Sequence, residues 1–360
     1  MTVYLGLMSG TSMDGIDAAL VDVTTHRFIG GITRPYDKDL QTQLQNIASN
    51  AAVTPAYLWQ LHTILGQQFA AAANQLLTTL AYPREQVTAI GSHGQTIVHD
   101  ATAKIPYTIQ LGCPHTISEL TGMTVVADFR TRDMVIGGQG APFAPLYHHV
   151  LFGESNKAFA VVNLGGIANI TVLSDEVRGY DLGPGNCLMD AWIASQDNQT
   201  YDIEGRYAAS GQMIPDLLTA MLKDDYFALP HPKSICKSYF SMDWLSQFLK
   251  PDYAPQDVQA TLLALTVQSI SDAIQANTAP IWRLMLCGGG AHNRALVQAL
   301  KHALPNIEVL STKELGIDPD FLEAMMFAWL AHQAMTETSL DLTHITGANK
   351  PAILGAIYKI

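Results

Sequence analysis

Two acidic residues stand where a carboxylate could do chemistry on a ligand. Asp181 begins the turn Asp181–Asn186, which can aim a carboxylate into a cleft, where it could serve as a general base. The same residue could instead cap the helix or turn that follows, so both roles stay open. Glu323 interrupts the apolar run Phe321–Leu330, and on spacing alone an isolated acid in a helix is expected to face water.

Three glycine-rich turns follow apolar segments and could offer backbone N–H groups to a phosphate. The second and third are centred on Gly165-Gly166 and on Gly288-Gly289-Gly290. The first gathers two hydroxyls and two carboxylates within eight residues, more than a connection between strands needs: Gly10, Thr11, Ser12, Met13, Asp14, Gly15, Ile16 and Asp17. No dinucleotide-binding fingerprint is completed, because Asn293 stands where the third glycine belongs, and no Gly-Lys pair forms a P-loop.

Further polar side chains follow predicted strands, where ligand groups commonly cluster. His93 and Gln95 come just after a strand that we expect to end at Ile90-Gly91. A buried, hydrogen-bonded role is an equal alternative for this histidine. Arg130 and Arg132 follow the next strand in a chain poor in cations. They could clamp an anionic group, or they could pair with the neighbouring aspartates.

Other chemistries find little support. The pair His148-His149 with Glu154 lacks a third metal ligand at suitable spacing and is interpreted as structural. No G-x-S-x-G element occurs, which disfavours a serine hydrolase. The four cysteines lie far apart, which favours reduced thiols over disulfides or a zinc site: Cys113, Cys187, Cys236 and Cys287.

Alternating strands and helices must position these residues. Apolar segments at 3–7 and 16–23 flank the first turn, and segments at 158–163 and 169–173 repeat the pattern around the second. Helical spacing then follows in each half, which predicts a duplicated α/β architecture with a ligand between the halves. We expect an N-terminal domain over 1–135, joined by the tail 340–360, a second domain over 136–339, and a hinge at the glycine cluster 137–140.

Composition limits the partners. A formal charge of −12 with only 20 Lys and Arg disfavours nucleic-acid binding, so an anionic ligand must rely on backbone N–H groups, a metal ion and a few placed arginines. No cationic leader and no run of eighteen apolar residues occur, so we expect a cytoplasmic protein without membrane contact. The sequence leaves a homodimer open.

The motifs taken together resemble the anhydro-N-acetylmuramic acid kinase family, within the actin and hexokinase-like superfamily. The resemblance runs from end to end and rests on the order and wording of these segments: Tyr4–Asp17, Gly91–Thr96, Val125–Arg130, Gly137–Pro142, Asn163–Asn169, Asp181–Trp192, Gly288–Asn293, and Glu323 with Phe327–Trp329. It implies two ribonuclease-H-like halves with a nucleotide cleft between them. It also implies a transferase that uses ATP and Mg²⁺ in amino-sugar metabolism and peptidoglycan recycling.

The resemblance further implies a reaction and a set of roles. ATP-dependent opening of the 1,6-anhydro bridge would place water at C1 and phosphate at O6, giving N-acetylmuramic acid 6-phosphate. Asp181 matches the catalytic base and Glu323 the acid near the bridge oxygen. Gly10–Asp17, Gly165, Gly166 and Gly183 would hold the phosphates, and Gly288, Gly289 and Gly290 the adenosine. The candidates for the sugar are then His93, Gln95 and Arg130.

A second class of function fits part of the same pattern. An actin-like ATPase that switches a binding surface would need only the phosphate turns and a hinge. A strict requirement for an anhydro-sugar in ATP turnover would favour the kinase, whereas stimulation by a protein partner would favour the switch.

Overall fold

The computed structural model describes residues 2–10, 12–48, 52–153, 158–174, 177–197, 199–230, 233, 235, 239–277 and 279–360. Thr11, Glu154 and Cys236, which the sequence singled out, lie outside the described residues. The chain forms two compact units, Met1–Tyr147 with Gly316–Ile360 and His148–Leu315.

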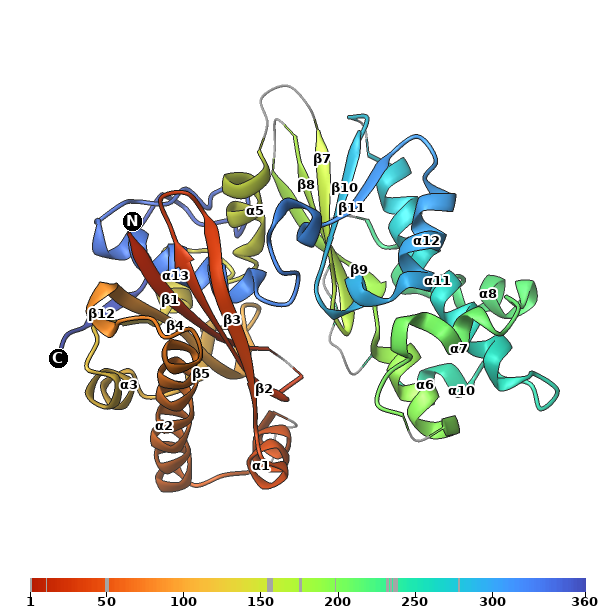
Figure 1. The fold of residues 1–360 in the computed structure, drawn as a ribbon. Helices are drawn as coiled ribbons and strands as arrows, with labels where there is room; N and C mark the ends of the chain where they lie inside the picture. Colours follow the sequence, from red (N-terminus) through yellow and green to blue (C-terminus); the bar gives the residue numbers. More distant parts are fainter. Residues whose placement is uncertain are drawn as a thin grey trace. The chain divides into compact units, whose positions relative to one another are not determined.

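The first unit is built on a seven-stranded sheet in the order β12-β6-β4-β1-β2-β3, with β5 paired to β4 (Figure 1). Neighbours β1, β2 and β3 are antiparallel, whereas β4 runs parallel to β1, and β6 parallel to β4. The strands are β1 (Val3–Ser9), β2 (Gly15–Asp22), β3 (Arg27–Pro35), β4 (Val87–Asp100), β5 (Tyr107–Leu111), β6 (Val125–Ala127) and β12 (Ala356–Tyr358).

The second unit repeats this topology with five strands in the order β11-β10-β7-β8-β9. Again three consecutive strands are antiparallel, and the fourth runs parallel to the first. The strands are β7 (Phe159–Leu164), β8 (Ile167–Leu173), β9 (Arg178–Pro184), β10 (Arg283–Cys287) and β11 (Glu308–Ser311). The predicted duplicated, ribonuclease-H-like α/β fold is therefore confirmed.

Helices cover both faces of the first sheet, which explains why every residue of β1 is buried. Its odd-numbered residues Val3, Leu5 and Leu7 share a core with Leu65 and Phe69 of α2. The helices of this unit are α1 (Lys38–Ala48), α2 (Pro55–Thr79), η1 (Arg84–Gln86), α3 (Pro114–Thr121), α4 (Phe129–Val135), α13 (Leu322–Met335) and the first part of α5 (Ala144–Phe152).

Two glycines let α13 lie directly on the other face of the sheet. Gly6 of β1 and Gly91 of β4 are paired in register. A Cβ atom on Gly6 would overlap the carbonyl oxygen of Ala324, and one on Gly91 would overlap that of Phe327. Close approach of a helix backbone therefore requires glycine at both positions, and it fixes the position of the first turn of α13, which holds Glu323.

The second unit packs its helices on the face of β7 and β10 that carries Ala160, Val162, Leu284 and Leu286. None of the helices in the part of the chain that the structure describes is long and apolar enough to cross a bilayer. The helices of the second unit are α6 (Cys187–Asp197), η2 (Ile203–Gly205), α7 (Arg206–Ala209), α8 (Pro215–Met221), α9 (Asp225–Ala228), α10 (Met242–Ser246), α11 (Pro255–Gln275), η3 (Gly289–His292), α12 (Arg294–Ala303) and η4 (Thr312–Leu315).

The compact units divide the chain differently from the predicted domains 1–135 and 136–339. The first unit extends to Tyr147 and resumes at Gly316, since α13 packs on β1 and β4 rather than on the second sheet. The tail 340–360 supplies β12, which pairs with β6. Periodicity could not reveal this, because an apolar helix such as α13 can cover either sheet.

Candidate active site

Buried polar side chains hold the turn between β1 and β2 through hydrogen bonds. The Ser9 hydroxyl lies 2.6 Å from the Gly15 carbonyl oxygen and 2.7 Å from Oε1 of Gln95. Gln95 Nε2 donates to the Gly10 carbonyl at 3.0 Å, and the Tyr36 hydroxyl donates to Ser9 at 3.1 Å. Gln95 therefore fixes the turn itself. Neither Ser9 nor Tyr36 was predicted as a site residue, although a serine at the end of an apolar strand was a signal for the first.

Carboxylates gather around this turn in the first unit. Asp17 is partly buried and accepts a 2.6 Å hydrogen bond from the Thr33 hydroxyl. Burial is the main cause that raises its pKa to about 7, and the negative charges of Asp14, Glu323 and Asp320 add to this effect. Such a concentration of negative charge suits a cation better than a bare phosphate.

His93 and Gln95 lie inside β4 and not after it, so the predicted end of this strand at Ile90-Gly91 is wrong. The strand continues to Asp100 because its second half pairs with β5. Both side chains are buried, the histidine at 5 % and the glutamine at 0 % exposure. Pairing with a strand further along the chain is not visible in local periodicity.

Arg130 lies in the first turn of α4 and is held on two sides. Its Nε donates to Nε2 of His93 at 2.9 Å, and its Nη1 donates to the Gly140 carbonyl at 2.6 Å. The Phe143 ring faces the guanidinium with its centroid 5.3 Å away. Burial lowers the pKa of Arg130 to about 10, while the charge of Glu323 opposes this shift. The guanidinium stays charged at neutral pH.

The glycine cluster 137–140 is anchored within the first unit. Gly140 N–H donates to Oδ2 of Asp133 at 2.7 Å, and the Thr346 hydroxyl donates to Oδ1 of the same carboxylate at 2.8 Å. Gln139 N–H also donates to the Thr346 carbonyl at 2.9 Å. This segment is a clamped loop within the first unit, and the two compact units divide after Tyr147 rather than at 137–140. The hinge at 137–140 stays a prediction.

The neighbouring aspartates do not pair with the two arginines. Within the described ranges, no ion pair joins Arg130 or Arg132 to Asp128 or Asp133, and Arg132 is exposed. Asp133 instead serves the clamped loop. Of the two arginines, only Arg130 is preorganised for a ligand.

Glu323 occupies the first turn of α13. Its side chain reaches solvent but stands among dense protein neighbours, and this desolvation raises its pKa, whereas the positive charge of Arg130 acts in the opposite direction. No ion pair joins these two side chains among the described residues. Glu323 faces water, as expected from its spacing, but its charge also acts on Arg130 and Asp17.

In the second unit, Asp181 lies within β9 and is held by the segment around 233–235. Its N–H donates to the Lys233 carbonyl at 2.9 Å, and its Oδ2 accepts from Ile235 N–H at 2.9 Å. Burial raises the pKa of Asp181, and the Ile235 hydrogen bond partly opposes this. The expected turn position is wrong, and so is a cap of α6, which begins only at Cys187. Neither Lys233 nor Ile235 carried a sequence signal.

Two glycine-rich segments of the second unit are joined by backbone hydrogen bonds. Gly185 N–H donates to the Gly166 carbonyl at 2.9 Å, and Asn186 N–H donates to the Gly165 carbonyl at 2.8 Å. A Cβ atom on Gly185 would overlap the Gly165 carbonyl. Gly183 lies near the end of β9, and a Cβ atom on it would stand 3.0 Å from the Phe227 ring. The β7–β8 turn thus rests on the entry to α6.

The third glycine segment packs against the end of β7. Gly288 has a φ of +77°, and a Cβ there would overlap Oδ1 of Asn163. A Cβ on Gly290 would stand 2.6 Å from that of Leu164. Gly289 differs, because nothing lies within 4 Å of its Cβ position. Its open side is the place where a ligand could approach the backbone closely.

The predicted site residues therefore fall into two sets. The first unit holds the described part of Gly10–Asp17 together with His93, Gln95, Arg130 and Glu323. The second unit holds Asp181, Gly183 and the segments 165–166 and 288–290.

Residues interpreted as structural have matching surroundings. His148 is buried, and its Nδ1 lies 2.9 Å from the Thr171 hydroxyl. Cys113, Cys187 and Cys287, the cysteines within the described ranges, are free thiols.

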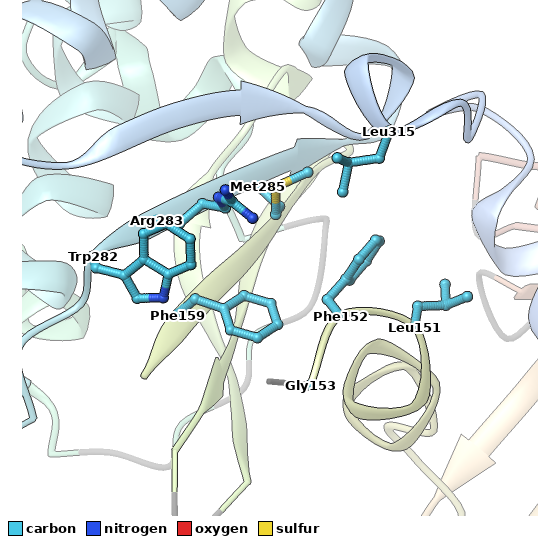
Figure 2. Close-up of a pocket in the computed structure, with 8 residues that line it drawn as sticks. All are labelled: Leu151, Phe152, Gly153, Phe159, Trp282, Arg283, Met285 and Leu315. Carbon is cyan, nitrogen blue, oxygen red and sulfur yellow. The ribbon is translucent and has the colours of Figure 1, made fainter. Parts of the chain in front are cut away.

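A separate hollow of about 180 Å³ lies in the second unit, and none of the predicted site residues lines it. Figure 2 shows the rings of Phe152 and Phe159 and the Met285 side chain around it. Arg283 at its edge is already paired with Glu308 at 2.7 Å. Most of the side chains that line the hollow are apolar, and the lining offers no group suited to phosphoryl transfer.

Comparison with known proteins places these observations in a family. The family model described as anhydro-N-acetylmuramic acid kinase matches residues 2–360. The protein of that name from Legionella pneumophila (strain Lens) is 54% identical over 100% of this chain and 99% of its own length. Its counterpart from Aliivibrio fischeri is 44% identical over 99% of both chains. Among solved structures, component A of the (R)-2-hydroxyglutaryl-CoA dehydratase of Acidaminococcus fermentans aligns with a TM-score of 0.48 at 11% identity, covering 91% of this chain and 97% of that one. On the evidence of the family model and the sequence relatives, the chain belongs to the anhydro-N-acetylmuramic acid kinase family.

Proposed function

We propose that the protein uses ATP and water to convert 1,6-anhydro-N-acetylmuramic acid into N-acetylmuramic acid 6-phosphate and ADP. This reaction would return an amino sugar of peptidoglycan to cytoplasmic metabolism. The observation that carries the proposal is the state of Asp181. One carboxylate oxygen is held by Ile235 N–H, burial raises the pKa, and no hydrogen bond reaches Oδ1 from any described residue.

Asp181 acts as the general base in this proposal. Water attacks C1 of the sugar and gives up a proton to Oδ1 of Asp181, while the bond between C1 and O6 breaks. A raised pKa makes the carboxylate a stronger base than an exposed aspartate, and the fixed Oδ2 limits its rotation. Both effects favour proton transfer from a weakly acidic water.

The released O6 is the phosphoryl acceptor. It forms a bond to the γ-phosphorus of ATP as the bond to the bridging oxygen of ADP breaks. In this proposal Glu323 assists at O6, where its carboxyl group, when protonated, can donate a hydrogen bond to the charge that develops on this oxygen. In this proposal Asp181 accepts a proton from water, and Glu323 donates a hydrogen bond to O6.

The glycine-rich turns hold the nucleotide. Gly10–Asp17, Gly165-Gly166 and Gly183 supply N–H groups to the phosphates, and the open side of Gly289 admits the adenosine. Magnesium suits the carboxylates of Asp14 and Asp17, since mutual repulsion among acids near Asp17 is relieved by a divalent cation. When bound, it neutralises phosphate charge.

The lactyl carboxylate of the sugar is assigned to Arg130, the preorganised guanidinium of the first unit. A charge-assisted contact of this kind contributes on the order of 2 kcal/mol when it is partly buried. His93 contributes to ligand binding through Arg130, and Gln95 through the turn at Gly10.

The test is mass spectrometry of the products formed from ATP and 1,6-anhydro-N-acetylmuramic acid in ¹⁸O-water. We expect one ¹⁸O atom at C1 and an unlabelled phosphate ester at O6. Phosphorylation without label at C1 would contradict the hydrolytic step. ATP hydrolysis that does not require the sugar would contradict the kinase and support a nucleotide-driven switch.

A further inference from the structure

We propose that His93 is a positioning residue for the sugar, acting through Arg130: its neutral ring accepts from the guanidinium and leaves one edge of that group for the substrate carboxylate. This inference rests on the proposed function in one respect, the assignment of Arg130 to the sugar. The sequence suggested that His93 contacts the sugar directly; the role inferred here is indirect.

The hydrogen bond itself determines the form of the imidazole. Arg130 Nε can only donate, and it lies 2.9 Å from Nε2 of His93. Nε2 must therefore carry its lone pair, so the ring is neutral with its proton on Nδ1. Burial and the positive charge of Arg130 both hold the pKa of His93 well below its usual range, in agreement with a neutral ring.

The guanidinium of Arg130 has three nitrogen atoms, and two of them form hydrogen bonds with the protein. Nε is bound by His93 and Nη1 by the Gly140 carbonyl at 2.6 Å. Nη2 makes no hydrogen bond to any residue that the structure describes, and Glu323 influences Arg130 without an ion pair. The two donors of Nη2 are consequently available to an anionic ligand.

Both groups that hold Arg130 are themselves held by packing or hydrogen bonds. The His93 ring packs on Phe327 of α13 with centroids 4.7 Å apart, and α13 is pressed onto the sheet at Gly91. Gly140 is fixed by Asp133, which is itself bound by Thr346. A guanidinium held in this way loses little side-chain entropy when it binds a carboxylate, and that saving appears as affinity.

The key variant is His93→Phe, which keeps a ring against Phe327 but removes the acceptor. The matched variant is His93→Gln, whose Oε1 can reach the position of Nε2 and accept from Arg130. Affinity for 1,6-anhydro-N-acetylmuramic acid and for ATP is measured by calorimetry, each ligand separately, after thermal melting has shown that the variants are folded. His93→Leu replaces His93→Phe if the latter does not fold.

We expect His93→Phe to weaken binding of the sugar by about tenfold, which corresponds to about 1.4 kcal/mol, with little change for ATP. His93→Gln should remain within about threefold of the wild type, because one charge-assisted hydrogen bond is restored. In an Arg130→Ala background, His93→Phe should cause no further loss, since a positioning residue has nothing left to position.

A second sugar separates this inference from the proposed function. 1,6-Anhydro-N-acetylglucosamine lacks the lactyl carboxylate, so His93→Phe should bind it as the wild type does. Equal weakening of both sugars and ATP, an undiminished effect in the Arg130→Ala background, or unchanged affinity for the muramic sugar would each overturn the role of His93. Failure of the wild type to bind either sugar would instead overturn the proposed substrate.

Discussion

Gln95 Nε2 donates a hydrogen bond of 3.0 Å to the carbonyl oxygen of Gly10, so the middle of β4 holds the turn that follows β1. The same amide accepts from Ser9, and its side chain is wholly buried. Gln95, which the sequence suggested as a sugar ligand, therefore contacts the turn that we propose holds the phosphates.

Gln95→Leu is expected to weaken ATP binding by about tenfold and sugar binding much less, since two hydrogen bonds that order the turn are lost. Titration of each ligand would show this. Gln110→Leu is the matched control, because it removes an amide on β5 that bonds Thr96 and Thr108 rather than the turn. If sugar binding suffers more than ATP binding in Gln95→Leu, the residue contacts the sugar after all.

Asp181→Asn is expected to lower turnover by a factor on the order of 10²–10⁴ and to leave ATP binding intact, since the swap removes the base but not the phosphate turns. Glu323→Gln should show a smaller defect, because it assists and is not the principal base. Steady-state rates and ATP affinities of folded variants would check both. Substantial turnover in Asp181→Asn would refute the assignment, and lost ATP binding would indicate a structural role.

The raised pKa of Asp181 also predicts the pH profile of the wild type. A general base works only when deprotonated, so kcat/KM should fall as pH drops through this pKa, and the fall should occur above the range of an ordinary aspartate, about 4. Initial rates across acidic pH would locate the fall. If kcat/KM instead fell at about pH 4, the pKa of an ordinary aspartate, Asp181 would not have the raised pKa expected of the base.

Asp17 predicts a pH dependence of stability. Its pKa of about 7 exceeds the value of about 4 for an unfolded chain. Between these values the native state binds more protons, so this residue lowers stability as pH rises from about 4 to about 7. Asp17→Asn removes the charge, and its melting temperature relative to wild type should therefore be higher at pH 8 than at pH 5.

Asp100→Asn is the control for this experiment, because hydrogen bonds with Thr102 lower the pKa of Asp100 and it stays ionised at both pH values. Its melting temperature relative to wild type should be constant between pH 5 and pH 8. A constant difference for Asp17→Asn as well would show that Asp17 has an ordinary pKa in the folded protein.

Adjacent glycines should respond in opposite ways. Gly289→Val places its side chain in open space, so we expect a stability change within about 0.5 kcal/mol but weaker ATP binding. Gly290→Ala meets Leu164 and Asn186 and should lose about 1–3 kcal/mol of stability. Chemical denaturation and ATP titration on each variant would separate the effects. Normal ATP affinity in Gly289→Val would move the adenosine elsewhere.

The sequence by itself determined the duplication and the candidate residues. Strand, turn and strand around 9–12 and around 165–166 are local patterns, since alternation of apolar side chains needs no distant partner. Asp181, Glu323 and Arg130 stood out because charged groups are unusual beside apolar segments. The family followed from the order of whole motifs.

Only the tertiary structure decided which residues serve one another. Arg130 and His93 are 37 positions apart, and their hydrogen bond depends on the parallel pairing of β4 with β6. Gln95 and Gly10 are 85 positions apart, and theirs depends on the parallel pairing of β1 with β4. Glu323 lies in the first unit because Gly6 and Gly91, which lack a Cβ atom, leave room for the backbone of α13 on the sheet. Long-range strand pairing and backbone contact leave no local periodicity, and for this reason the expected strand end at Gly91 had to be corrected and the two units divide after Tyr147 rather than near 135.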